Sequence, residues 1–464
     1  MKLKHLGKFA IAVIMALCFV ACGSARTQDY SQFSQDETLT IAVPSGYARI
    51  FQALAAAYRG ANPDADVEII SFDCDEAARV HIGLQLMAGN APVMIYGAWV
   101  DYLDPFAARH LTDWFNIMHA DPNFDEDMWF MNVFDAVSAN GQMRGFPLFY
   151  TYYYIAANSL VPGLAEALEA HKTISVEEMI ELHRQFSTNH RMYLAHGFGL
   201  NFALEQQLGN FFNLETGKVD FANRQFSDVF TTSRNITHHN QLCRREMDNN
   251  IRGNWYAEEI LSYRYFFRKI DNLDFEYKSI FDRDTLFVNP TLLTNQRGEL
   301  LIRPGITFAL SSAASPCMQA MAFDFLRYIK DANECWRELY IMFYGLLHPP
   351  APLSVNRGYL RFQSEYIFLE VLRRGYRSAV WADHIWNTSL LREDITDIIY
   401  PKMAAAGDMP MADMRYGPDI VTAIVREAYW QFYSGLVSAD QSAHDLQNRI
   451  TIALMERDIN VNSK

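Results

Sequence analysis

Aromatic side chains crowd into one short stretch of the sequence, Gly145–Asn158 (GFPLFYTYYYIAAN), which carries six rings between Phe146 and Tyr154. Strand alternation would put Phe149, Thr151 and Tyr153 on one side and Tyr150, Tyr152 and Tyr154 on the other. A buried strand is one interpretation, and the wall of a binding site is the other. Tyrosine has an apolar body and a polar tip, so we expect the ends of the segment to pack and Tyr152 or Tyr153 to face a ligand.

Further candidate residues follow from the elements at the start of the chain. Thr38–Pro44, Val67–Phe72 and Ala91–Ala98 are predicted strands, alternating with predicted helices over 50–58 and 76–88. This order indicates an α/β fold with a parallel sheet, and ligands bind beyond the carboxyl ends of such strands. The loops at those ends are Ser45-Gly46-Tyr47, Asp73-Cys74-Asp75 and Trp99-Val100-Asp101.

Motifs for catalysis or cofactor binding do not support an enzyme. The sequence has no G-x-S-x-G, H-E-x-x-H, P-loop or EF-hand motif. His238 and His239 are adjacent, so they could not easily face one metal from a helix. Carboxylates such as Asp101 and Asp104 could in principle serve a glycosidase, but such groups are usually exposed. We expect no enzyme activity, no metal site and no cofactor.

The first residues have the pattern of an export signal. Three lysines precede the uncharged apolar run Phe9–Ala21, which is too short to span a bilayer comfortably. The segment before Cys22 resembles a bacterial lipobox, which implies lipidation of Cys22. Residues 1–21 are then a lipoprotein signal peptide, and the polar residues 22–37 a flexible tether. We expect a lipid-anchored protein on the outer face of the cytoplasmic membrane, at the cell surface or in the periplasm.

Composition limits the partners. The net charge of −14 argues against nucleic acid and against electrostatic docking on anionic lipid. Cys74, Cys243, Cys317 and Cys335 are widely spread and have no metal-type spacing, so buried thiols are favoured, with one disulfide as the alternative.

Several segments together resemble the carbohydrate-binding family of extracellular solute-binding proteins of ABC importers, which includes maltose-binding proteins. The resemblance lies in their order along the chain: MAGNAPVMIYGAWVDYLDPFAARHLTDW, GQMRGFPLFYTYYYIAANSLV, GITFALSSAASPCMQAMAFDFLRYI, YGLLHPPAPLSVN and YWQFYSGLVSADQSAHDLQNRITIALME. Val93 departs from the family's usual Asp, Ile155–Asn158 departs from its Y-x-Y-N, and 221–288 matches weakly.

The resemblance implies a type II periplasmic-binding-protein fold: two α/β domains joined by three crossings, with a ligand cleft between them. The implied N-terminal domain comprises residues 38–148 and 305–346, and the C-terminal domain 152–300 and 356–460. The crossings would fall near 149–154, 301–307 and 347–355. Closure of such a hinge buries the ligand and creates the shape that a permease binds.

A carbohydrate ligand would need flat rings for stacking and carboxylates or amides for its hydroxyl groups. The candidate ligand-binding residues are Tyr47, Trp99, Asp101, Tyr152, Tyr153, Trp255, Trp381 and Asp383. Trp99 has an alternative role as a packing anchor. The expected partners are a carbohydrate, ABC permease subunits and the membrane through the lipid, with the protein a monomer. Two alternatives remain: a ligand-sensing lipoprotein docked on a membrane sensor, and a secreted carbohydrate-active enzyme.

Overall fold

The computed structural model describes residues 37–186, 193–196, 208–213, 216–231, 233–234, 265–271, 287–330, 353–357, 404–413, 419–456 and 462–463. Among the predicted features, the signal peptide, the tether up to residue 36, Cys22, Trp255, Trp381 and Asp383 lie outside these residues.

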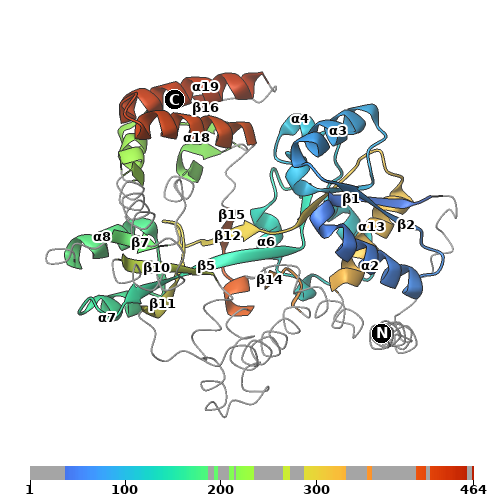
Figure 1. Ribbon diagram of the computed structural model, residues 1–464, viewed down its shortest axis with the longest axis horizontal. Helices are drawn as coiled ribbons and strands as arrows, with labels where there is room; N and C mark the ends of the chain where they lie inside the picture. Colours follow the sequence, from blue (N-terminus) through green and yellow to red (C-terminus); the bar gives the residue numbers. More distant parts are fainter. Residues whose placement is uncertain are drawn as a thin grey trace, which may run out of the picture.

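The first sheet confirms the predicted strand–helix alternation. Its order is β2-β1-β3-β13-β4, with β1 parallel to β2 and β3, and β13 antiparallel to both of its neighbours. The strands are β1 (Leu39–Pro44), β2 (Val67–Phe72), β3 (Met94–Tyr96), β4 (Gly145–Pro147) and β13 (Thr307–Leu310). Long helices α2 (Ser45–Ala61), α3 (Asp75–Ala88) and α13 (Pro316–Lys330) pack around it (Figure 1). We call this unit, with residues 39–147 and 307–330, the first lobe.

Shorter helices complete the first lobe. They are η2 (Gly97–Trp99), α4 (Pro105–Ala108), α5 (Trp114–Ala120), η3 (Glu126–Met128) and α6 (Met131–Ala136). Local carboxylates begin three of them. Asp104 accepts a hydrogen bond from the Phe106 amide, Asp113 from that of Phe115 and Asp125 from that of Asp127.

The two crossover helices differ in how well their buried face follows the sequence pattern. Helix α2 buries the predicted stripe that contains Phe51, Leu54 and Tyr58. On α3 the apolar stripe Val80, Leu84 and Met87 is exposed, at 62%, 58% and 54%. The buried face of α3 consists instead of Ala78, Ile82 and Leu86, which contact the core around Trp99. Helical spacing alone could not distinguish these two stripes.

The second sheet surrounds one long strand, β5 (Phe149–Asn158). Its path is β15-β12-β5-β10-β7; β11 and β14 also pair with β5, and β6 pairs with β11. These strands are β6 (Thr173–Ile174), β7 (Tyr193–His196), β10 (Tyr265–Asp271), β11 (Phe287–Leu293), β12 (Leu300–Pro304), β14 (Leu353–Ser354) and β15 (Met411–Asp413). Helices α7 (Leu164–Glu169) and α8 (Val176–Phe186) pack on it. Figure 1 shows β5 and β12 running between the two halves.

The chain passes between the sheets at neighbouring points. Leu148 separates β4 from β5, and Gly305 and Ile306 separate β12 from β13. The Leu148 amide donates to the Ile306 carbonyl at 2.7 Å, and the Gly305 amide donates to Phe149 at 2.7 Å. The Val355 amide lies 3.5 Å from the Leu148 carbonyl. The described residues of all three crossings therefore lie side by side, and Leu148 immediately precedes the predicted crossing segment 149–154.

Strand alternation in β5 is as predicted, but both faces are buried. Tyr150, Tyr152 and Tyr154 belong to the core shared with the first lobe, while Tyr153 and Ile155 pack against α7 and α8. Tyr152 is 0% exposed and pairs with Ile302; Tyr153 is 5% exposed and pairs with Asp271. The expectation that one of them faces ligand at the hinge is therefore corrected, since both lie inside the second sheet.

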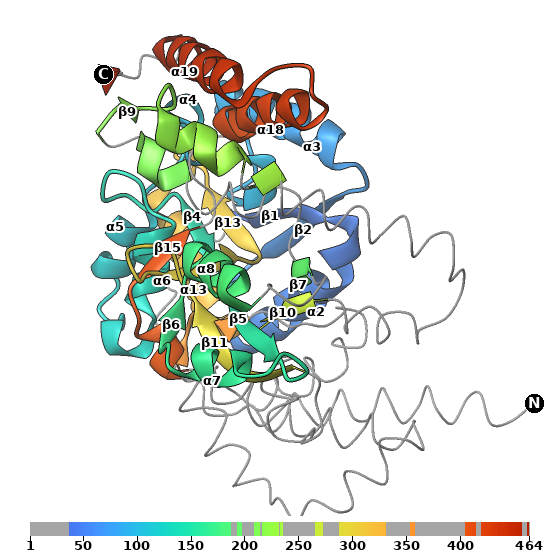
Figure 2. The same ribbon diagram turned by 90° about the vertical axis from the view of Figure 1, so that its left-hand side faces the viewer.

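A separate helical lobe comprises residues 208–231 and 419–456, and it has its own hydrophobic core. Helices α18 (Asp419–Tyr433) and α19 (Ala439–Met455) pack side by side, near short strands β8 (Phe212–Asn213), β9 (Lys218–Val219) and β16 (Asn462–Ser463) (Figures 1 and 2). A capping box of Ser438 and Gln441 begins α19. Gln447 joins the two parts, accepting from the Phe221 amide at 2.6 Å and donating to the Val219 carbonyl at 2.7 Å.

Two other expectations concern membrane spans and thiols. Among the described helices, none combines the length and the apolar character that a membrane crossing requires. The Cys74 thiol is exposed rather than buried, because it lies at the start of α3 on the surface. Cys317 is half-buried, and Cys243 and Cys335 lie outside the described residues.

The packing of Gly145 generates a stability prediction. A Cβ atom at Gly145 would lie 2.6 Å from the ring of Tyr102, which is 3% exposed and has little room to move. We expect Gly145→Ala to lower the free energy of unfolding by about 1–3 kcal/mol, measured by urea denaturation. Gly83→Ala is the matched control, because nothing lies within 4 Å of its Cβ and it is inside α3. That change should be neutral or stabilise by about 0.5–1 kcal/mol. Equal effects of the two substitutions would contradict the packing argument.

Candidate ligand-binding site

The carboxyl ends of β1, β2 and β3 meet at one edge of the first sheet, because the three strands are parallel. A helix follows each of these strands. Tyr47 lies in the first turn of α2, Asp75 is the first residue of α3, and Trp99 is the last residue of η2. Topology therefore gathers side chains from three separate loops into one cluster. We call Tyr47, Phe72, Asp75, Tyr96 and Trp99 the strand-end cluster.

Ring contacts run continuously through this cluster. The centroids of Tyr47 and Tyr96 are 6.0 Å apart, those of Tyr96 and Trp99 5.5 Å, and those of Trp99 and Phe72 5.2 Å. The last two pairs are edge-to-face, a geometry that aromatic rings favour. Tyr47 and Tyr96 are half-buried, so part of each ring is accessible to a ligand.

Trp99 is the buried residue against which Phe72 and Tyr96 of the cluster pack. It is 4% exposed, and its indole Nε1 donates to Asp75 Oδ1 at 2.8 Å. This satisfies the only polar atom of the buried side chain. Of the two roles considered for Trp99, the structure places it in the packing role, and its ring offers little surface for stacking.

Gly97 allows the chain to turn tightly after β3. A Cβ atom there would lie 2.1 Å from Thr307 Oγ1 and 3.1 Å from the Thr307 carbonyl on β13. Any larger residue would push η2 away from the sheet, and with it Trp99.

Tyr96 was not among the sequence candidates, although it lies at the centre of the cluster. It is the last residue of β3 and precedes Gly97, so its place at a strand end was the available signal. Burial is the main cause that raises the pKa of its hydroxyl from 10.0 to about 12, helped by the charges of Tyr47 and Asp75 and by a hydrogen bond shared with Tyr47. Because a tyrosine of ordinary pKa is already protonated at neutral pH, the shift has consequences only under alkaline conditions.

Asp101 lies two residues beyond Trp99 and contacts the helical lobe. Its Oδ2 accepts a hydrogen bond from the Asp419 amide at the start of α18, at 2.7 Å. The structure thus brings Tyr47, Trp99 and Asp101 into one region, as their loops predicted, while Tyr152 and Tyr153 lie elsewhere, inside the second sheet.

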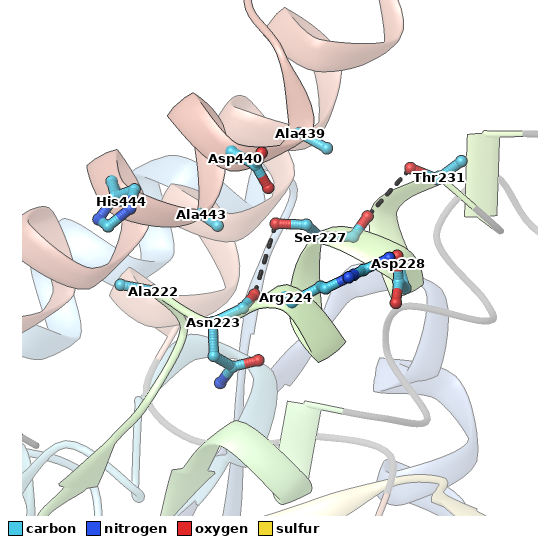
Figure 3. A pocket seen from close by; sticks show the side chains of 10 residues that line it. All are labelled: Ala222, Asn223, Arg224, Ser227, Asp228, Thr231, Ala439, Asp440, Ala443 and His444. Carbon is cyan, nitrogen blue, oxygen red and sulfur yellow. Dashed lines mark hydrogen bonds between the residues drawn. The ribbon is translucent and has the colours of Figure 1, made fainter.

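A polar pocket of about 570 Å³ lies apart from the cluster, between residues 222–231 and the start of α19 (Figure 3). Its ionisable side chains are Arg224, Asp228, Asp440 and His444. Its hydroxyls bond within their own helix, Ser227 to the Asn223 carbonyl and Thr231 to that of Ser227. It lacks the accessible aromatic rings of the strand-end cluster, so it is the weaker candidate.

Within the described residues, no cluster of three or more His, Cys, Asp or Glu side chains has the arrangement needed to hold an ion.

Comparison with solved structures identifies the fold. The chain resembles the sugar-binding protein MalE of Xanthomonas citri (TM-score 0.58, 13% identity), with 91% of this chain and 98% of the other covered. A periplasmic oligogalacturonide-binding protein of Yersinia enterocolitica is similar (TM-score 0.58, 10% identity, 91% and 100% covered). So is an extracellular solute-binding protein of family 1 from Alicyclobacillus acidocaldarius (TM-score 0.54, 12% identity, 90% and 98% covered).

The chain therefore has the type II fold of periplasmic solute-binding proteins, as its sequence led us to expect. No family model matches the sequence, and no curated protein is significantly similar to it. At 10–13% identity the likeness establishes the fold alone.

The raised pKa of Tyr96 leads to a prediction about alkaline stability. Between pH 10 and about 12 an unfolded Tyr96 loses its proton while the folded one keeps it, so ionisation favours the unfolded chain. The contribution of Tyr96 is thus fully present below pH 10 and is lost as the pH rises toward 12. We expect the free energy of unfolding of Tyr96→Phe to fall less steeply than that of the wild type across this window. Urea denaturation at successive pH values measures the difference, and parallel profiles would contradict the assignment.

Proposed function

We propose that this protein is an extracytoplasmic solute-binding protein that captures a carbohydrate, with an oligosaccharide as the first candidate, and delivers it to an ABC transporter permease. The observation that carries the proposal is the strand-end cluster, in which the accessible rings of Tyr47 and Tyr96 lie beside the carboxylate of Asp75. A sugar presents apolar faces and polar edges, so it needs rings for one and acceptors for the other.

The comparisons support the same ligand class without establishing it. Two of the similar structures carry a sugar or an oligogalacturonide in their names, and the third is named as a solute-binding protein. One fold hosts many functions, so the ligand must be argued from the site. In the proposed site Tyr47 and Tyr96 contact the sugar, while Trp99 packs against Tyr96 and bonds to Asp75. Asp101, Trp255, Trp381 and Asp383 remain predicted contacts.

The proposal predicts that a sugar will stabilise the folded chain. A ligand that binds only the folded state at a hundred times its dissociation constant adds about 2.7 kcal/mol to the free energy of unfolding. We expect one or more members of an oligosaccharide panel to raise the melting temperature in a thermal-shift assay. Tyr47→Ala should weaken the affinity for that sugar about tenfold, because a ring contact contributes on the order of 1 kcal/mol.

Phe106→Ala is the matched control for Tyr47→Ala. Phe106 is an exposed aromatic residue of the same lobe, outside the cluster, and its backbone amide keeps its bond to Asp104. Its replacement should leave the affinity unchanged. If no sugar or polyol shifts the melting temperature, the protein does not bind a carbohydrate. If both variants weaken binding equally, the strand-end cluster is not the binding site.

We further propose that a lipid on Cys22 attaches the protein to the outer face of the cytoplasmic membrane. A doubly or triply acylated cysteine anchors stably, whereas a single acyl chain binds only marginally. Cys22→Ser should shift the protein from the membrane fraction to the soluble exported fraction, measured by fractionation and immunoblotting. Cys18→Ser is the control, because this neighbouring cysteine lies inside the apolar run of the signal. Retention of the Cys22→Ser protein in the membrane would contradict lipidation at this residue.

A further inference from the structure

Among the described residues, Asp101 and Arg79 of the first lobe both make a polar contact with Asp419, the residue that begins α18 in the helical lobe. Asp101 Oδ2 accepts a hydrogen bond from the Asp419 backbone amide at 2.7 Å. A guanidinium nitrogen of Arg79, on α3, lies 3.5 Å from Asp419 Oδ2. Figures 1 and 2 both show α18 near α3 and α4, although the helices belong to units with separate cores.

The beginning of α18 needs an acceptor that its own sequence does not supply. The first amides of a helix have no partner within the helix, and a preceding Ser, Thr, Asp or Asn usually provides one. The residues before Asp419 are Gly417 and Pro418, and neither has a side chain that can accept a hydrogen bond. Helix α19 of the same lobe differs, because Ser438 and Gln441 cap it locally. The first turn of α18 instead receives a carboxylate from another lobe.

The strengths of the two contacts are unequal. Asp101 is half-buried, and its carboxylate lies at the positive end of a fifteen-residue helix, which favours a charged acceptor. Arg79 and Asp419 have side chains that are 52% and 68% exposed, and ion pairs of this kind contribute little. Arg79 offsets the repulsion between the two neighbouring carboxylates, while the bond to Asp101 is the main link.

We propose that Asp101 is a clasp that holds the helical lobe against the first lobe, at the loop after η2. The bond exists only while the start of α18 lies against this loop, so separation of the lobes breaks it and leaves the Asp419 amide without this acceptor. Asp101 is two residues from Trp99, so the clasp and the cluster share one loop. If the cluster binds the ligand, the clasp would set how far the helical lobe can move from the loop that borders the cluster. Only this last consequence depends on the proposed function.

The test compares Asp101→Ala with Ser438→Ala in the full chain without ligand. Each removes the cap of one helix in the same lobe, but only the first cap comes from another lobe. We expect Asp101→Ala to increase hydrogen exchange in the first turn of α18 about fivefold to tenfold and to raise the radius of gyration in small-angle X-ray scattering. Ser438→Ala should increase exchange at the start of α19 and leave the radius unchanged.

Two more variants separate charge from hydrogen bonding and guard against misfolding. Asp101→Asn keeps an acceptor oxygen and should give a smaller increase than Asp101→Ala, with the circular dichroism spectrum unchanged. Arg79→Ala should change exchange less than twofold, as expected of an exposed ion pair. The clasp is overturned if Asp101→Ala leaves both readouts unchanged, if Ser438→Ala expands the molecule equally, or if Arg79→Ala has the larger effect. A failed sugar screen would leave the clasp standing, because neither readout needs a ligand.

Discussion

The backbone of β5 is hydrogen-bonded to neighbouring strands along its length, and most of the described architecture depends on this pairing. β12 and β14 pair with its first half, and β10 and β11 with its second. Its two faces serve different hydrophobic cores, one shared with the first lobe and one with α7 and α8. A central strand buried on both sides favours aromatic and apolar side chains and does not tolerate a shift of register. This explains the long run of tyrosine, isoleucine and alanine better than ligand binding does.

Parallel pairing in the first sheet has a second consequence, which concerns function. It places the ends of β1, β2 and β3 at one edge, so loops distant in sequence supply one cluster. The residues of that cluster differ in burial. Trp99 is buried and bonds to Asp75, whereas the rings of Tyr47 and Tyr96 are partly accessible. Asp101, at the rim, bonds to a different lobe.

The sequence was informative where a local pattern has a single structural solution. Two features could be predicted because each depends on a period: the alternation of strands and helices over 38–98, and the two faces of β5. Patterns with two solutions were harder: α3 carries two apolar stripes, and the one that contains Ala78 is buried. Tyr152 is buried because it pairs with Ile302, a residue far along the chain, and a local sequence pattern does not predict such a pairing. Tyr96 was not predicted as a site residue because it is the last residue of a strand, and the candidates came from the loops that follow the strands.

The crossings at Leu148, Gly305–Ile306 and Val355 are bonded to one another through their backbones. Figure 1 shows α18 apart from β14, the strand that leads into Val355. Such an arrangement behaves as a lever with a short arm at the pivot and a long arm at the helical lobe. A few degrees of backbone rotation at these residues would sweep the start of α18 over a much larger path. A bond at the end of the long arm is therefore broken by a smaller rotation than the same bond beside the pivot. The position of the Asp101 bond makes it sensitive to the first few degrees of hinge rotation, while its free energy sets how far it shifts the equilibrium between the two arrangements.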